Sequence, residues 1–297
     1  MRCKAQSTAL PIGKASIRNA AARPYRVDSA DPISVIQWTS IAGTMSIAKS
    51  FARLPPDAAG APLYRQTKQA LLAAIESGRY PPASALPNET ALAAALGVSI
   101  GTLRHAVDEL VAERIVVRRQ GRGTFVATHT TERFVFQFFH VERSDGARDA
   151  PAVELLSFER GRLDDEAAAA LACRAGDAAI LVENRLSLQG CPVVYDRLTL
   201  PAALFRGLTE KRLRERPSTI YHLYQTAFAI TVVRATERVR AVSADRTVAR
   251  VLGVTPGSAV LQVRRTALTF NDKPVEYRVS TISTSQHDYV STLAPQA

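Results

Sequence analysis

From residue 62 onward, apolar positions first follow the spacing of short helices. Between Leu63 and Ser77 they recur every three or four residues, which predicts a helix that Gly78 ends. Asn88 is placed to cap a second, Ala-rich helix that runs through Leu96. Gly97 then supplies the left-handed residue with which many helices end.

The pattern continues with a third helix and then changes to that of two short strands. Ser99 is placed to cap a helix from Ile100 to about Glu113. Strands are predicted at Ile115–Arg119 and Thr124–Ala127, joined by Gln120–Gly123, whose glycines permit a tight reversal. Three helices followed by a hairpin are the element order of a winged helix-turn-helix.

The second half contains an internal repeat, with copies at Asp164–Pro201 and Ser243–Ser285. Each copy predicts a helix that begins with acidic residues, a turn ending in glycine, a long strand rich in Val, Ile and Leu, a polar turn, and a strand that begins with proline. Further strands are predicted at Phe134–Val141, Val153–Arg160 and Ile230–Val242. The chain is therefore expected to be α+β, with a mainly antiparallel sheet and flanking helices that can enclose a ligand cavity.

Residues 1–60 show no periodicity, and we expect a disordered basic extension or an upstream-extended start before Met45. The expected domains are a DNA-binding unit at 61–128 and a second unit at 132–295. Lys and Arg outnumber Asp and Glu by 38 to 27, and this net charge of +11 favours an anionic partner. The three cysteines have no CxxC pairing or neighbouring His cluster, so no metal, cofactor or disulfide framework is expected. This use of cysteine favours a reducing cytoplasm. Charges interrupt the longest apolar stretches before they reach bilayer-spanning length, so no membrane span is expected.

Motifs in the first unit resemble the GntR family of bacterial transcription regulators. They occur in order at Pro62–Gln66, Leu86–Glu89, Gly97–Ser99, Thr102–Arg104 and Arg119–Val126. The resemblance implies binding to a double-stranded DNA operator. The residues expected to contact DNA are Arg65, Asn88, Glu89, Ser99, Thr102, Arg104, Gln120, Gly121, Arg122, Gly123 and Thr124.

Physical chemistry supports three of these assignments directly. Ser99 opens a helix whose N-terminus favours phosphate, and Arg104, one turn further on, can bind a guanine in the major groove. Arg122 at the hairpin tip can approach the minor groove. A solvated helix face is the competing interpretation of Arg104. Many family members carry arginine where this chain has Ile100, which points to an atypical operator.

The second unit resembles the UTRA effector domain of the HutC-type branch of the family, which has a chorismate-lyase-like fold. The resemblance rests on Asn184–Leu186, Gly190–Val193, Asp196 and Lys273–Tyr277. It implies an effector pocket formed by Arg185, Asp196, Glu276 and Arg278, in which arginine clamps an anion and the acids orient polar groups. Ser187 replaces a common basic residue, which favours a carboxylate or amino-acid-like effector over a sugar phosphate. Cross-strand ion pairs on an exposed sheet face are the competing interpretation.

These patterns together predict a homodimeric DNA-binding repressor that responds to a small polar metabolite. One alternative is a second domain that only dimerises, and another is a chorismate-lyase-like enzyme, although no nucleophile, base and acid set appears. Tyr221, His222 and Tyr224 are expected to pack in the interior or edge a dimer interface. An interior cavity containing Arg185 or Asp196, instead of apolar side chains, would favour a sensor over a dimerisation module.

Overall fold

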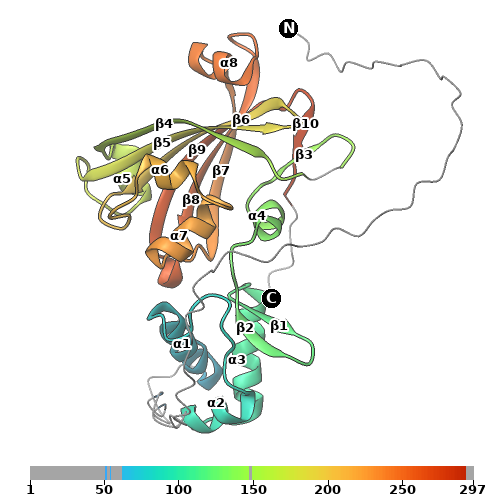
Figure 1. Ribbon diagram of the computed structural model, residues 1–297, viewed down its shortest axis with the longest axis vertical. Coiled ribbons are helices and arrows are strands. Elements are labelled where there is room, and N and C mark those ends of the chain that lie inside the picture. Colours follow the sequence, from blue (N-terminus) through green and yellow to red (C-terminus); the bar gives the residue numbers. More distant parts are fainter. Residues whose placement is uncertain (1–50, 52–53, 55–61, 147–148, 292–297) are drawn as a thin grey trace, which may run out of the picture. The chain divides into compact units, whose positions relative to one another are not determined.

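The computed structural model describes residues 51, 54, 62–146 and 149–291. The expected extension at 1–60 therefore lies almost entirely outside the described residues. The described chain forms a small helical unit followed by a larger sheet domain, drawn in blue-green and in green to red, respectively, in Figure 1.

The first unit has the predicted winged helix-turn-helix order. Its elements are α1 (Leu63–Glu76), α2 (Glu89–Leu96), α3 (Ile100–Ala112), β1 (Val116–Arg119) and β2 (Gly123–Val126). Leucines at helical spacing are fully buried, because each helix turns its apolar stripe inward. These leucines are Leu71, Leu92, Leu96, Leu103 and Leu110.

The second domain is built on a six-stranded antiparallel sheet with the order β4-β5-β6-β9-β8-β7. Its strands are β4 (Ala152–Arg162), β5 (Ala178–Leu188), β6 (Cys191–Pro201), β7 (Arg234–Ser243), β8 (Ala259–Leu268) and β9 (Pro274–Ile282). A separate two-stranded ladder joins β3 (Val141–Arg143) to β10 (His287–Tyr289).

The sheet order confirms the repeat predicted from the sequence. The unit of β4, α5 (Asp165–Ala170), β5 and β6 corresponds to the unit of β7, α8 (Arg246–Leu252), β8 and β9. The two units meet at β6 and β9, which pair antiparallel in the middle of the sheet. The pairing of β6 with β9 joins both units in one sheet, so the repeat forms a single domain.

The two faces of the sheet carry different helices. One face packs against α4 (Thr131–Gln137), α6 (Glu210–Arg214) and α7 (Ile220–Phe228), and the cluster between them is the largest in the described chain. The opposite face packs against α5 and α8 in two smaller clusters. Successive side chains of a strand point to opposite faces, so the position of a residue along its strand decides which of these helices it contacts.

The predicted strand at Phe134–Val141 was wrong over most of its length. The structure has helix α4 at Thr131–Gln137, and strand β3 begins only at Val141. The Thr130 hydroxyl caps this helix by accepting a hydrogen bond from the backbone N–H of Arg133. Phe134 and Phe138 lie four residues apart and are both buried, so this apolar run satisfies helical spacing as well as that of a buried strand.

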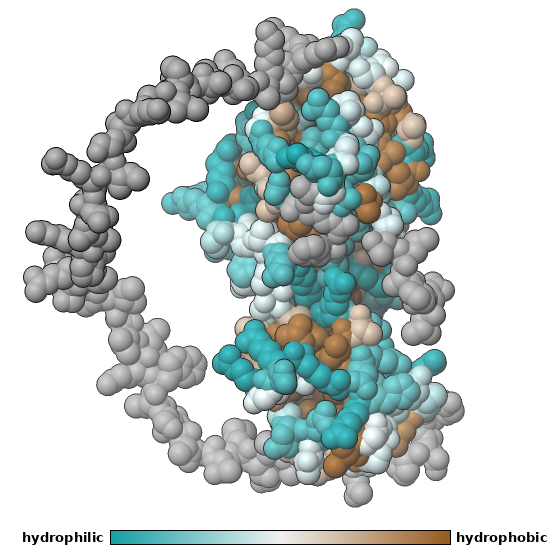
Figure 2. Space-filling model, turned by 90° about the vertical axis from the view of Figure 1, so that its right-hand side faces the viewer, coloured by the Kyte–Doolittle hydropathy of each residue, from teal (hydrophilic) through white to brown (hydrophobic). Residues whose placement is uncertain are grey.

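Polar side chains cover much of the face seen in Figure 2, with apolar side chains gathered in smaller areas between them. Among the described residues, no single helix is long and apolar enough to cross a membrane. The pair α2 and α3 passes on combined length and composition, but the two helices are bent by 109°.

Candidate functional site

The turn between α2 and α3 is fixed by side-chain caps. Asn88 Oδ1 accepts a hydrogen bond from the N–H of Ala91 at 2.7 Å, and Ser99 Oγ accepts one from the N–H of Thr102 at 3.1 Å. Gly97 between the helices has φ +70°, a conformation that costs a side-chain-bearing residue energy. Ser99 and Thr102 therefore lie side by side at the N-terminus of α3, with Ser99 exposed.

Arg104 points outward from α3, where its side chain is 63% exposed. Its Nε donates to Glu89 Oε2 on α2 at 2.6 Å, and this hydrogen bond raises the pKa of the Arg104 guanidinium. Arg118 of the hairpin contacts the other Glu89 oxygen and also pairs with Asp108. Glu89 thus contacts two exposed arginines, Arg104 closely and Arg118 at 3.9 Å.

The hairpin tip has the reversal expected from its glycines. Gly121 and Gly123 have φ values of +67° and +104°, and Gln120 and Arg122 are exposed beside them. Thr124, half-buried, pairs with Arg118 in the β1–β2 ladder. Arg65 lies at the start of α1, where its Nε donates to the Tyr64 hydroxyl at 3.1 Å.

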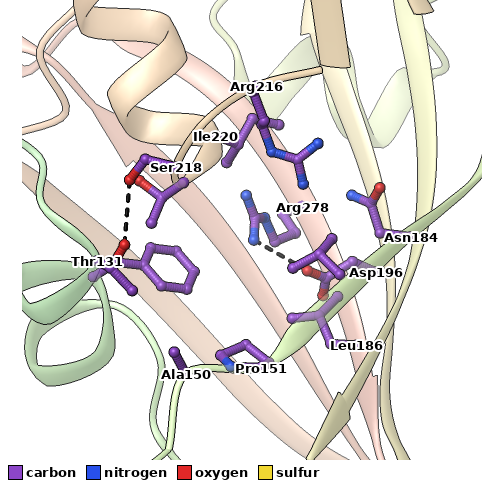
Figure 3. A pocket seen from close by; sticks show the side chains of 13 residues that line it. Thr131, Ala150, Pro151, Asn184, Leu186, Asp196, Arg216, Ser218, Ile220 and Arg278 are labelled. Atoms are coloured by element: carbon purple, nitrogen blue, oxygen red, sulfur yellow. Dashed lines mark hydrogen bonds and ion pairs between the residues drawn. The ribbon is translucent and has the colours of Figure 1, made fainter. Parts of the chain in front are cut away.

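The sheet domain contains a cavity of about 170 Å³ between the sheet and helices α4 and α7 (Figure 3). Its walls come from the start of β4, the middle of β5, β6 and β9, and the segment that enters α7. The lining residues are Thr131, Phe134, Ala150, Pro151, Val153, Asn184, Leu186, Asp196, Arg216, Ser218, Thr219, Ile220 and Arg278. A cavity of about 150 Å³ accommodates benzene, so this one suits a ligand of roughly one ring.

A buried charge network forms one side of the cavity. Arg278 donates from Nη1 to Asp196 at 3.1 Å, and from Nε and Nη2 to the two oxygens of Glu276 at 2.9 and 3.1 Å. The same carboxylate accepts the hydroxyls of Tyr221 at 3.1 Å and Tyr224 at 2.7 Å. All five residues are at least 96% buried, so the arginine and both acids are fixed by one another.

Burial and the nearby Glu276 raise the pKa of Tyr221 to about 12, and the same causes raise the pKa of Tyr224 well above its ordinary value. Burial alone would lower the pKa of Arg278, but Glu276 holds it well above its ordinary value. These groups therefore keep their charge states near neutral pH. Tyr221, Tyr224 and Arg278 therefore contribute fixed polar groups to this wall of the cavity.

Two other polar groups at the cavity are less engaged. The guanidinium of Arg216 points into the cavity beside Arg278 (Figure 3), and none of the described carboxylates forms an ion pair with it. It donates to the carbonyl of Leu213, while burial, with a smaller contribution from Arg278, lowers its pKa. Asn184 Oδ1 is buried without a hydrogen-bond partner in the described chain. The cavity thus offers one uncompensated cation and one free amide acceptor.

The structure places Asp196, Glu276 and Arg278 together but does not bring Arg185 to this cavity. Arg185 follows Asn184 on β5 and therefore faces the other side of the strand. It lies directly opposite Glu154 of β4 and pairs with that carboxylate. The Asp196 and Arg278 side chains line the cavity. Glu276 does not line it and instead accepts hydrogen bonds from Arg278.

Sequence reasoning missed Arg216 and Asn184 as cavity residues. Asn184 carried a usable signal, because it shares strand parity with Val182 and Leu186, both buried. Arg216 carried none, since it lies between α6 and α7, where no periodicity applies. Tyr221 and Tyr224 do pack in the interior, as predicted. Among the described residues, no group of His, Cys, Asp or Glu is arranged to hold a metal ion.

Two family descriptions match the chain. Residues 63–126 match the bacterial regulatory proteins of the gntR family, and residues 146–288 match the UTRA domain. These segments correspond to the winged helix-turn-helix and to most of the sheet domain.

Named relatives match over most of their length. The chain is 26% identical over 232 residues to the HTH-type transcriptional repressor NagR of Bacillus subtilis, covering 77% of this chain and 93% of that protein. It is 30% identical over 187 residues to the histidine utilization repressor of Klebsiella aerogenes, covering 61% and 78%. The solved ligand-binding domain of a Bordetella bronchiseptica protein assigned to the GntR family is 34% identical, with a TM-score of 0.50, and covers 52% of this chain and 96% of that one.

Proposed function

The chain belongs to the GntR family of bacterial regulatory proteins and carries a UTRA domain, and from this we infer that it is a repressor controlled by a small carboxylate bound in the cavity of the sheet domain. Several of its relatives are named as transcriptional repressors. Regulation by a ligand therefore agrees with the family. The identity of the ligand and the residues that hold it are our proposal.

The observation that carries this proposal is the unpaired guanidinium of Arg216 in a cavity with apolar walls. A half-buried cation without a carboxylate partner is costly, and a ligand carboxylate would form the charge-assisted hydrogen bonds that it lacks. The N-terminus of α7, with Thr219 and Ile220 at the cavity, adds a partial positive charge. Arg216 thus takes the clamping role that the sequence assigned to Arg185.

The rest of the lining narrows the ligand class. Phe134, Val153, Leu186 and Ile220 suit an apolar body, and Asn184 Oδ1 suits one hydrogen-bond donor on that body. A sugar phosphate carries several hydroxyls and up to two charges, for which this cavity has too few free partners. A carboxylate of about one ring in size is therefore favoured, in line with the sequence-based preference.

For DNA binding we propose a homodimer, with each head presenting α3 to the major groove and the hairpin tip to the minor groove of one half-site. Arg104, oriented by Glu89, would read a base, while Ser99, Thr102 and Asn88 would contact phosphate. Exposed Ile100 stands where relatives often have arginine, so the operator would differ from theirs. We place this regulator in the cytoplasm, because the operator DNA that it binds lies in that compartment.

A second domain that only dimerises is less favoured, because Asp196, Arg278 and Arg216 line the cavity where apolar filler would stabilise a core better. An enzyme is also less favoured, because Asp196, the carboxylate that accepts the Ser280 hydroxyl, is itself paired with Arg278, which makes it a weak base. A domain that only dimerises predicts no ligand binding in the cavity, and an enzyme predicts that the ligand is converted to a product.

The test uses the full chain and matched pairs of ligands. Purified protein would be titrated with benzoate, a one-ring carboxylate, and with benzamide, its neutral counterpart of the same shape. An operator selected from random duplex DNA would then be bound with and without each compound. We expect benzoate to raise the melting temperature and change operator affinity, and benzamide to do neither. Equal effects of both compounds, or no binding of benzoate, would refute the carboxylate assignment, and turnover of the compound would favour an enzyme.

A further inference from the structure

Residues Ala127–Thr130, here called the linker, connect β2 of the head to α4 of the sheet domain. A single side chain of α7 contacts it twice. Gln225 Nε2 donates to the carbonyl of Ala127 at 3.1 Å, and Gln225 Oε1 accepts from the N–H of His129 at 3.1 Å. The two partners fix the orientation of the amide, because a backbone carbonyl can only accept and a backbone N–H can only donate.

This contact is buried on both sides. Gln225 is 3% exposed, Ala127 4% and His129 1%. The His129 ring packs against Phe138 and Tyr221, with ring centroids 5.9 and 5.8 Å apart. Gln225 Nε2 also donates to Thr231 Oγ1 at 3.2 Å, but Gln225 Oε1 and the N–H of His129 would be left buried without a partner if the linker moved away. This cost favours the contact between the linker and Gln225.

Both helices that hold the linker also form walls of the cavity. Helix α4 begins immediately after the linker, and its Thr131 and Phe134 line the cavity. Helix α7 carries Gln225 and begins at Ile220, which lines the cavity from the other side. The Thr131 and Ser218 hydroxyls are hydrogen-bonded at 3.3 Å between these two walls (Figure 3). A ligand that changes the spacing of α4 and α7 therefore acts on both attachments of the linker.

The linker is also hydrogen-bonded directly to the head. The N–H of Ala127 donates to the carbonyl of Ile115, the residue before β1, at 2.9 Å. The same residue thus belongs to the backbone hydrogen bonds of the head through its N–H and to Gln225 through its carbonyl. Two hydrogen bonds, from Gln225 to Ala127 and from Ala127 to Ile115, therefore connect α7 to the base of the hairpin.

We propose that Gln225 is the positioning residue that transmits occupancy of the cavity to the linker and so to the DNA-binding head. Gln225 does not line the cavity, so its role is separate from ligand affinity. The inference rests on the proposed ligand-binding function. It adds the residue through which that function reaches DNA, since a ligand shifts a conformational equilibrium only by contacts that differ between the two states.

Three variants of the full chain test it. Gln225→Ala removes both contacts, and Gln225→Glu keeps the acceptor for the His129 N–H but loses the donor to Ala127. Thr226→Ala is the matched control, because this neighbouring hydroxyl donates within α7, to the carbonyl of His222, and contacts no residue of the linker. Gln225→Glu also serves as the second variant if the alanine substitution prevents folding.

Hydrogen–deuterium exchange of peptides spanning 127–133 is measured first without ligand. Loss of a hydrogen bond worth about 1 kcal/mol predicts roughly fivefold faster exchange in Gln225→Ala than in the control. Equal exchange in the two variants would overturn the inference, since Gln225 would then not hold the linker.

The second measurement adds millimolar benzoate. We expect peptides spanning 216–224 to become protected in every variant, while the linker and operator affinity respond in the parent and in Thr226→Ala but not in Gln225→Ala. An undiminished response in Gln225→Ala overturns the inference and leaves the proposed function intact. Absence of protection at 216–224 in the parent overturns the proposed ligand, and the transmission role with it.

Discussion

Asn184 on β5 lies directly opposite Asp196 on β6, so the cross-strand neighbour of Asp196 is an amide and not the adjacent Arg185. Both side chains face the cavity, whereas Arg185 lies on the other side of the strand and pairs with Glu154. Arg185 thus lies away from the cavity and Arg278 lies at it, although the sequence motifs assigned both arginines to the effector pocket. Among the described residues that line the cavity, Arg278 is paired with carboxylates and Arg216 is not.

Replacement of Arg216 should weaken binding of a carboxylate ligand. In Arg216→Gln a charge-assisted hydrogen bond worth about 1.5–3 kcal/mol is lost, which predicts roughly 10- to 100-fold weaker binding in a calorimetric titration. Arg185→Gln is the matched control and should bind the ligand as the parent does. The reverse order of effects would return the clamping role to Arg185.

Replacement of Arg104 should weaken operator binding selectively. If Arg104 contacts a base, Arg104→Ala should cost about 1–3 kcal/mol on the operator and much less on unrelated duplex DNA, as measured by fluorescence anisotropy at fixed salt. Arg212→Ala removes an exposed arginine of α6 and serves as the charge-matched control. Equal losses on both DNAs would mean that Arg104 contacts phosphate only.

The buried charge network should be sensitive to the loss of one partner. Glu276→Gln removes the charge that faces Arg278 and two tyrosine hydroxyls, so the free energy of unfolding should fall by about 3–5 kcal/mol in urea. Glu210→Gln breaks an exposed pair with Arg214 and should cost less than about 0.5 kcal/mol. Similar losses in both variants would contradict the role assigned to Glu276.

His129 should make the domain less stable in acid. Burial, and next the charge of Arg133, lowers the pKa of His129 from its ordinary 6.5 to about 3. Between these values the unfolded chain binds a proton that the folded chain excludes. Stability should therefore fall as pH drops from 6.5 toward 3, by at most about 1.4 kcal/mol per pH unit from this residue. Urea unfolding of His129→Gln at pH 6.5 and 5 should show a shallower pH dependence, and parallel profiles would contradict the prediction.

Much of the fold could be predicted because it depends on local signals. Asn88, Gly97 and Ser99 define the helix boundaries of the head by capping and by one left-handed residue, and the structure has these helices where they were predicted. The repeated helix and hairpin likewise appear in the sheet order. The run from Phe134 was misassigned, because continuous apolar residues fit a helix and a buried strand equally well.

The sequence by itself determined the head, the repeated sheet and the set of charged residues available for recognition, since caps, turns and periodicity act between residues close in the chain. Only the tertiary structure decided which charges neutralise one another. Strand register gave Asp196 to Arg278 and Glu154 to Arg185, whereas Glu276 reaches Arg278 from two residues away on the same strand. Packing of α7 on the sheet then brought Arg216 to the cavity and Gln225 to the linker. The contacts of Asp196, Arg185 and Gln225 join residues far apart in the chain, and no local pattern encodes which partner each of these side chains meets.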